Sequence, residues 1–249
     1  MAVSPEHAII MAGGKGSRLH PHTMASPKPL ITMGGGTILG IIIKQLRSIG
    51  VSRITLCVWH LADMIMDEFG DGSRLGVEVD YCVDPVPRGT AGPLADVPGW
   101  TRPAVVMNAD VLTRLNFADL FTHHITTSAL LTVAAHAQEL VVDYGVLQVA
   151  RDQVVALVEK PTVKLNVSAG IYVASPEVRE FVPAIGWFGM NDLVRDLIGK
   201  EKPVHAYQFS EEWFDIGTPE RLAEARRSLA AMPAAYLPES IREGHYTPT

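Results

Sequence analysis

The feature that most constrains this chain is an apolar segment that runs directly into a glycine-rich loop. Residues 8–12 read Ala-Ile-Ile-Met-Ala, and residues 13–19 read Gly-Gly-Lys-Gly-Ser-Arg-Leu. An apolar run without alternation is typical of a strand that is covered on both faces. Glycines let backbone N–H groups approach an anion closely, and the cations Arg18 and Lys28 suit phosphate oxygens. The segment therefore predicts a buried strand with a triphosphate site at its end.

Composition narrows the class of protein. The 249 residues are 47% apolar with a net charge of −6, which is an ordinary globular composition, and the length suits one large α/β domain or two small ones. The negative charge and the lack of a basic run argue against a nucleic-acid partner. Cys57 and Cys82 lie in apolar runs and are expected to be buried, reduced thiols. Residues 2–7 do not resemble a signal peptide and no run is long enough to cross a membrane, so a cytoplasmic protein is expected.

Strands and helices alternate through the first half of the chain. The apolar spacing after Thr37 predicts a helix that ends at Gly50, and residues 61–69 predict a second helix. Strands are expected at 54–58, 77–82 and 104–107. This order predicts a mostly parallel sheet with helices on both faces. Ligands bind outside the carboxyl ends of such strands, so the glycine loop and Asp110 are expected to share one site.

The second half has a different pattern. Four apolar segments with short connections predict antiparallel strands at 129–135, 144–149, 153–158 and 167–173. Helices are expected at 176–182, at 190–199 and from Thr218, with strands at 203–209 and 213–214. We expect one domain over residues 1–232, divided near residue 110 into two halves, and a tail over 233–249.

The glycine loop matches neither of two common phosphate-binding patterns. A Walker A loop would need Gly-Lys-Ser/Thr after a four-residue gap, and Leu19 occupies the place of the third glycine in a dinucleotide fingerprint. A plain glycine turn between a strand and a helix is the structural alternative.

Seven motifs in order resemble the sugar-1-phosphate nucleotidyltransferases. The first two are the glycine loop with Pro27-Lys28-Pro29-Leu30, and Gly89-Thr90-Ala91-Gly92. The others, which extend the resemblance to about residue 230, are Asp110, Tyr144-Gly145-Val146, Glu159-Lys160-Pro161, Ser168-Ala169-Gly170-Ile171-Tyr172 and Trp213-Phe214-Asp215-Ile216-Gly217-Thr218-Pro219. The resemblance implies a Rossmann-like α/β fold with a nucleotide-binding half over 1–110 and a smaller antiparallel sugar-binding lobe within 111–232.

The resemblance also implies a reaction and its catalytic residues. A sugar 1-phosphate attacks the α-phosphorus of an NTP, and pyrophosphate leaves with Mg²⁺ as cofactor. The phosphate dianion is already a nucleophile, so the reaction needs positioning and charge neutralisation. By resemblance, the pyrophosphate binds Arg18, the α-phosphate binds Lys28 and the sugar phosphate binds Lys160. Asp110 and Asp215 are the implied ligands of Mg²⁺.

The same resemblance implies two groups of ligand-binding residues. The implied nucleotide-binding residues are Met11, Ala12, Gly13, Gly14, Lys15, Gly16, Ser17, Gly89, Thr90 and Asn108. The implied sugar-binding residues are Tyr144, Gly145, Glu159, Ser168, Ala169 and Gly170. A homo-oligomer is left open.

The short form of the chain is most similar to guanylyltransferases that act on mannose-, heptose- or related higher-sugar 1-phosphates, which favours GTP. It also resembles the short transferase that acts on N-acetylmuramate 1-phosphate with UTP. Uridylyl, thymidylyl and cytidylyl transfer stay open. A glycosyltransferase would usually carry Asp-x-Asp, which this sequence lacks, and a non-catalytic sensor should have lost a phosphate or metal ligand. The sequence departs from the family pattern at His20, His22, Arg88 and Ser168.

Overall fold

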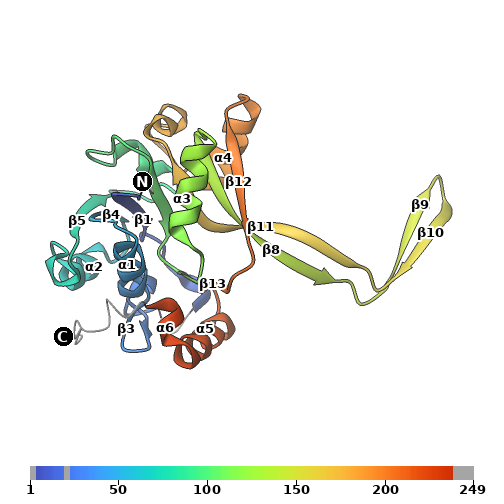
Figure 1. Cartoon of the computed structure of the whole chain (residues 1–249), viewed down its shortest axis with the longest axis horizontal. Coiled ribbons are helices and arrows are strands. Elements are labelled where there is room, and N and C mark those ends of the chain that lie inside the picture. The colour runs from blue at the N-terminus through green and yellow to red at the C-terminus, as the bar shows by residue number, and fades with distance from the viewer. Residues whose placement is uncertain (1–3, 20–22, 238–249) are drawn as a thin grey trace.

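A seven-stranded sheet forms the centre of the molecule, in the order β12-β8-β11-β6-β1-β4-β5 (Figure 1). The computed structural model describes residues 4–19 and 23–237. Among the strands so described, β11 alone runs antiparallel to its neighbours in this sheet. The strands are β1 His7–Met11, β4 Arg53–Val58, β5 Glu78–Val83, β6 Ala104–Asn108, β8 Leu131–Val141, β11 Thr162–Ala174 and β12 Val204–Phe209. The predicted mixed, mostly parallel sheet is confirmed.

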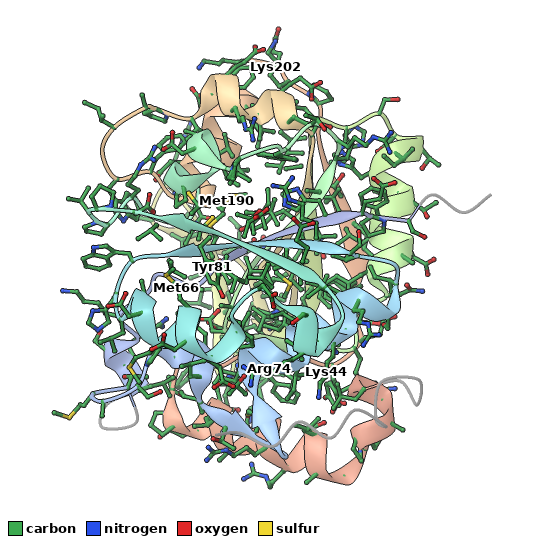
Figure 2. All side chains as sticks on the ribbon, turned by 90° about the vertical axis from the view of Figure 1, so that its left-hand side faces the viewer. Lys44, Met66, Arg74, Tyr81, Met190 and Lys202 are labelled. Carbon is green, nitrogen blue, oxygen red and sulfur yellow. The ribbon has the colours of Figure 1, made fainter. Side chains whose placement is uncertain are left out.

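Helices cover both faces of the sheet. Figure 2 shows these layers, with Met190 on one side of the sheet and Met66 on the other. One face carries α1 Ile38–Ser48, α2 Ala62–Phe69, α3 Phe117–Thr126 and α5 Pro219–Ala231, and the other carries α4 Met190–Gly199 with the 3-10 helices η4 Gly92–Asp96 and η5 Pro176–Phe181. The remaining short elements are η1 Ser17–Leu19, η2 Lys28–Leu30, β2 Thr32–Met33, β3 Gly36–Thr37, η3 Ser73–Leu75, β7 Val111–Thr113, β13 Trp213–Asp215 and α6 Pro233–Tyr236.

Strand β1 shows why its sequence has no alternation. Ile10 lies in the apolar cluster that includes α1, whereas its neighbour Ile9 lies in the cluster that includes α4. Both side chains are fully buried. Because adjacent side chains of a strand point to opposite faces, a strand between two helical layers needs apolar residues at every position.

The connections place a binding crevice beside β1. The chain leaves β1 toward β4 and β5 and then crosses to β6 on the other side of β1. Met11, the last residue of β1, pairs with Cys57 of β4 and with Asn108 of β6. The direction of winding therefore reverses between β1 and β6, which is where open α/β sheets bind ligands.

The predicted antiparallel strands of the second half are present, but they serve two purposes. Strands β8 and β11 extend the central sheet and then continue beyond it as a two-stranded ribbon (Figure 1). The hairpin of β9 Gly145–Ala150 and β10 Gln153–Glu159 lies at the end of this ribbon. We call residues 137–166, which begin and end at the pair Ala137 and Asn166, the arm.

The packed chain continues past residue 232. Tyr236 of α6 is buried, and its hydroxyl donates to Glu212 Oε2 at 3.0 Å and contacts Ser228 Oγ at 2.8 Å. The residues expected to form a tail therefore begin with a short helix on the core. His20, His22 and the chain from residue 238 lie outside the described residues. Within the described ranges, no helix has the length and apolar character needed to cross a membrane.

A buried histidine makes the stability of the fold depend on pH. His124 of α3 is held between Thr132 Oγ1 at 2.9 Å and Ser175 Oγ at 3.1 Å, and burial, followed by the nearby His123 and His205, lowers its pKa to about 4. The unfolded chain binds this proton near pH 6.5. The contribution of neutral His124 to the free energy of unfolding is therefore fully present above pH 6.5. The free energy of unfolding falls by about 3 kcal/mol as the pH drops to 4.

Urea unfolding between pH 7 and 4 checks this expectation. The His124→Gln variant should lose less stability over that range than the wild type. A residual slope is expected from His7, whose pKa burial also lowers to about 4. Equal slopes for the variant and the wild type would contradict the assignment.

Candidate active site

The glycine loop after β1 is packed at Gly13 and Gly16 and open between them at Gly14. Gly16 has a φ of +62°, and a Cβ there would lie 3.2 Å from Lys28 Cβ. Thr23 Oγ1 donates to the Gly16 carbonyl at 2.8 Å, which ties the loop to the segment that carries Lys28. At Gly14, by contrast, a Cβ would meet no atom within 4 Å. Gly13 is packed like Gly16, because a Cβ there would lie 3.1 Å from the Trp59 backbone nitrogen. The loop thus leaves open space at Gly14, as an anion cradle requires.

Two adjoining cavities lie at the carboxyl ends of the central strands. The first encloses about 400 Å³ and the second about 480 Å³, and both are lined by Thr90, Asn108 and Trp187. Of the predicted site residues, the first cavity also contains Met11, Ala12, Gly13, Gly14, Lys15, Arg18, Lys28, Gly89 and Asp110, and the second contains Ser168, Ala169, Gly170 and Asp215. The structure therefore gathers most of the predicted residues into one continuous site.

Asp110 and Asp215 are brought together by a small antiparallel pair. Asp110 lies two residues beyond the end of β6, and Asp215 ends β13, which pairs with β7. The Ile216 N–H donates to the Asp110 carbonyl at 2.9 Å. Burial and then the negative charge of Asp110 raise the pKa of Asp215, while Lys28 and Arg18 oppose this shift. The two carboxylates therefore concentrate negative charge where the two cavities meet.

The residues present fit a magnesium ion. Asp110 Oδ2 accepts a hydrogen bond from Lys28 Nζ, but Asp110 Oδ1 is buried and has no partner among the described residues. An unpaired buried carboxylate oxygen beside a second carboxylate is a donor set that suits a hard cation. Mg²⁺ typically uses one or two carboxylates and takes its other ligands from water and phosphate. Asp110 and Asp215 are thus the residues that would hold it.

Two cations lie beside the aspartate pair. Lys28 is only 8% exposed and its ammonium contacts Asp110. The Arg18 guanidinium lies beside Gly217, where a Cβ would come within 3.5 Å of its carbon atom. Both cations line the first cavity. They supply the charge that a triphosphate requires.

The loop at residues 88–92 is fastened to the segment before α4. The N–H groups of Ala91 and Gly92 both donate to the Phe188 carbonyl at 3.0 Å, and Thr90 Oγ1 accepts from the Met190 N–H at 2.9 Å. Gly89 has a φ of +82°, and a Cβ there would lie 2.5 Å from the Phe188 oxygen. Only glycine fits this close approach.

Arg88, a departure from the family pattern, has a structural explanation. It is buried, and its guanidinium bonds to Asp96 and to the carbonyls of Pro183 and Ala184 at 3.3 and 3.2 Å. The side chain therefore crosslinks the loop at 88–92 to the segment before Trp187. It forms part of the wall of the first cavity.

A bulge in β11 shapes the second cavity. The pairing of β11 with β8 shifts between Ser168 and Tyr172, and bulges of this kind often re-aim side chains at functional sites. Gly170 has a φ of +70° and packs against Asn108, whose Nδ2 would lie 2.6 Å from a Cβ. Trp213 Nε1 donates to the Ala169 carbonyl at 2.9 Å. Residues 168–170 are thereby held against the end of β6.

Four of the residues predicted to bind the sugar 1-phosphate lie outside the two cavities. The structure places Tyr144, Gly145, Glu159 and Lys160 on the arm, outside both cavities of the same chain (Figure 1). Lys160 Nζ lies 2.7 Å from Asp143 Oδ1, and both side chains are exposed. The continuous pairing of β8 with β11 holds all four away from the body. Gly16 and Ser17 belong to the glycine loop but do not line either cavity.

Sequence reasoning missed several residues that line the cavities. Trp59 follows β4, so the rule that pointed to Asp110 at a strand end would have found it. The ammonium of Lys15 lies 5.3 Å from the centre of its ring. Trp187 lies in an irregular segment, and Asn191, Asp192 and Arg195 lie in the first turns of α4, where no local pattern separates them from an ordinary helix start.

The fold and this site define an α/β protein with a carboxylate pair between two cavities at the carboxyl ends of its strands. The model of the nucleotidyl transferase family matches residues 7–231, and the chain belongs to this family. The predicted family membership is confirmed.

Two curated relatives are similar to most of the chain. A mannose-1-phosphate guanylyltransferase of Mycobacterium tuberculosis is 31% identical over 247 residues, which cover 94% of this chain and 68% of that protein. A UTP–glucose-1-phosphate uridylyltransferase of Synechocystis is 31% identical over 231 residues, which cover 84% of this chain and 60% of that protein.

Solved structures share the fold. HddC from Yersinia pseudotuberculosis gives a TM-score of 0.71 at 24% identity, covering 90% of this chain and 99% of that one. A putative glucose-1-phosphate thymidylyltransferase from Bacillus anthracis gives 0.72 at 22% identity, covering 89% and 94%. These similarities confirm the architecture.

Proposed function

We propose that this protein transfers a nucleotidyl group from an NTP to a sugar 1-phosphate and releases pyrophosphate. The observation that carries the proposal is the aspartate pair at the junction of two cavities, with the buried Asp110 Oδ1 unpaired among the described residues. One cavity offers a glycine loop with the cations Arg18 and Lys28, and the other offers polar side chains for a hydroxylated ligand.

The first cavity positions the triphosphate. The loop is open at Gly14, so its backbone can approach an anion closely, and Arg18 and Lys28 neutralise the phosphate oxygens. An oxygen of the sugar phosphate attacks the α-phosphorus, and the bond from that phosphorus to the β-phosphate oxygen breaks. The electron pair leaves with pyrophosphate, beside Arg18. No general base is needed, because the attacking phosphate oxygen carries no proton.

Lys28 and the aspartates set the charge at the reacting phosphorus. Lys28 bonds to Asp110, so its ammonium is held at the junction rather than free to move. A magnesium ion bound by Asp110 and Asp215 would neutralise developing charge on the phosphates. Charged groups that are held in place before the reaction stabilise the transition state without reorganisation.

The second cavity would hold the sugar. Ser168 Oγ contacts the Tyr172 hydroxyl at 3.1 Å, and Asn191 and Asp192 lie at the start of α4. Trp213 and Trp187 add flat apolar surface to the same cavity. Hydroxyl, amide and carboxylate groups beside aromatic rings suit a ligand with many hydroxyls.

For the base and the sugar we propose GTP and a mannose- or heptose-type 1-phosphate. The relative from Mycobacterium, which covers 94% of the chain, is named a mannose-1-phosphate guanylyltransferase. HddC was also solved in a complex named with GMP-PN. The uridylyltransferase relative is equally identical over a shorter stretch, so UTP is the alternative.

A substrate panel tests the proposal. The protein is incubated with Mg²⁺, each of GTP, UTP, dTTP and CTP, and mannose, glucose or heptose 1-phosphate, while pyrophosphate is measured. We expect the highest kcat/KM with GTP. In a melting assay, an NTP at 100 times its Kd adds about 2.7 kcal/mol of stability. If no pair releases pyrophosphate, the proposed reaction is wrong; if UTP is fastest, the proposed base is wrong. Release of a nucleoside diphosphate would indicate a glycosyltransferase instead.

A further inference from the structure

The arm exposes an unusual amount of apolar surface. Twelve of the twenty large apolar side chains that are exposed among the described residues lie between Leu140 and Leu165. In β9 the neighbours Val146 and Leu147 are both exposed, and in β10 the neighbours Leu157 and Val158 are both exposed. Because neighbours in a strand point to opposite faces, the hairpin is apolar on both sides.

A hairpin of this composition is expected to pack against another protein surface. An isolated two-stranded hairpin is marginally stable in water, and strands without alternation normally lie between two packed layers. Clustered exposed apolar side chains on a folded protein mark an interaction surface. We therefore expect a protein surface to cover the arm.

The body of the same chain cannot provide that surface without breaking the arm. The pairing of β8 with β11 is continuous from Ser168 and Ala135 to Thr162 and Val141. Beyond it, the Val142 N–H donates to the Pro161 carbonyl at 3.0 Å and the Lys160 N–H to the Tyr144 carbonyl at 3.2 Å. Lys160 is eight residues from Ser168, which corresponds to about 26 Å of extended strand. The ladder thus holds Lys160 away from its own second cavity.

The second cavity, in turn, has no unpaired cation among the described residues that line it. Arg195 is the single cationic side chain among the described residues that line it, and its guanidinium donates to Asp192 Oδ1 at 2.8 Å. Asp192 and Asp215 add negative charge to the same cavity. A phosphate dianion that enters here would meet more negative than unpaired positive charge.

Lys160 is a cation on the exposed apolar arm, and its ion pair with Asp143 joins two exposed side chains, which makes it weak. Lys160 sits at the base of the hairpin with a φ of +47°, a conformation that residues other than glycine rarely adopt. Strain of this kind gathers at functional positions. Glu159, its neighbour, adds a hydrogen-bond acceptor at the same place.

We propose that two copies of this chain exchange arms, so that Lys160 and Glu159 of each copy complete the second cavity of the other. The apolar hairpin is then covered by the body of the second copy. On that body Ile185 and Trp187 are exposed, and Trp187 forms part of the cavity wall. Reciprocal exchange gives a closed twofold dimer with no unpaired arm. This inference rests on the proposed function, because it assigns the sugar phosphate to the partner's Lys160.

The mass in solution tests the exchange independently of activity. Light scattering should give 54.0 kDa, twice the 27.0 kDa of one chain. Leu147 and Leu157 are exposed and face each other across the hairpin. The double variant Leu147→Asp, Leu157→Lys keeps a cross-strand pair but removes apolar surface, and it should be monomeric with an unchanged circular dichroism spectrum. A wild-type protein that is monomeric at micromolar concentration, or a double variant that stays dimeric, would overturn the proposal.

Mixed dimers test the exchange of residues. The Asp110→Asn variant has a defect in the body and an intact arm, whereas the Lys160→Ala variant has an intact body and a defect in the arm. Each variant should therefore be nearly inactive by itself. Refolding the two together at equal amounts produces hybrids in half of the dimers, each with one intact site. We expect about a quarter of wild-type activity to return. Lys164→Ala, an exposed lysine of the same arm, should remain fully active alone.

The outcomes separate the two proposals. If hybrids form and no activity returns, or if Lys160→Ala is as active as the wild type, the exchanged arm does not serve the site. If the wild type turns over no substrate pair, the proposed function fails, and the mass measurements still decide whether the arms are exchanged.

Discussion

Replacing Asp110 by asparagine is expected to lower kcat by about three orders of magnitude. Asparagine keeps the size of the side chain and an oxygen that can accept from Lys28, but it removes the charge that faces the junction of the cavities. The unpaired Asp110 Oδ1 is the clearest candidate ligand for Mg²⁺ in the described structure. Losing one ligand of a metal that neutralises the transferred phosphate commonly costs this much.

The fold should survive this change. The charge of Asp110 raises the pKa of Asp215, so the substitution relieves a repulsion and lowers that pKa. The melting temperature is therefore expected to stay within a few degrees of the wild type, while the Mg²⁺ concentration needed for half-maximal NTP binding rises. Asp63→Asn, on the exposed first turn of α2, is the matched control and should keep its activity. Full turnover by Asp110→Asn would remove the aspartate pair from the mechanism.

Replacing Lys28 by methionine is expected to lower kcat by about 100-fold. Methionine retains the apolar stem that is buried in η2, but it removes the ammonium that bonds to Asp110. Removing one preorganised donor from a phosphate-transfer site costs about two to three orders of magnitude. Lys28→Arg should recover part of the loss, because it restores the charge with a different shape.

The pH profile gives this variant a second readout. Lys28 lowers the pKa of Asp215, so its removal raises that pKa. The carboxylate is then reached at a higher pH, and the acid limb of the activity profile should move upward. Lys202→Met, a surface lysine beside Phe181, is the control and should change neither kcat nor the profile. An unchanged acid limb in Lys28→Met would show that Asp215 does not control it.

Much of the fold was predictable because its determinants are local. The apolar run that forms β1 has to be covered on both faces, and the helix at Met190–Gly199 follows from the spacing of its apolar residues. Glycines at positive φ mark turns that other residues adopt only with strain, as at Gly16 and Gly89. Polar residues that directly follow buried strands, such as Asp110, lie at the edge where such sheets bind ligands.

The sequence by itself determined the α/β class, the glycine loop and Asp110 at the end of a strand, because burial pattern and backbone sterics act over a few residues. Asp215 was indicated by the resemblance to the family. The tertiary structure decided which of these residues meet. The β7–β13 pair places Asp215 beside Asp110, and the Arg88 bonds explain an unusual residue as a crosslink. It also carried Glu159 and Lys160 outward on the arm, although their motif predicts a place in the site. The length and register of β8 and β11 depend on pairing between distant segments, and no local pattern contains that information.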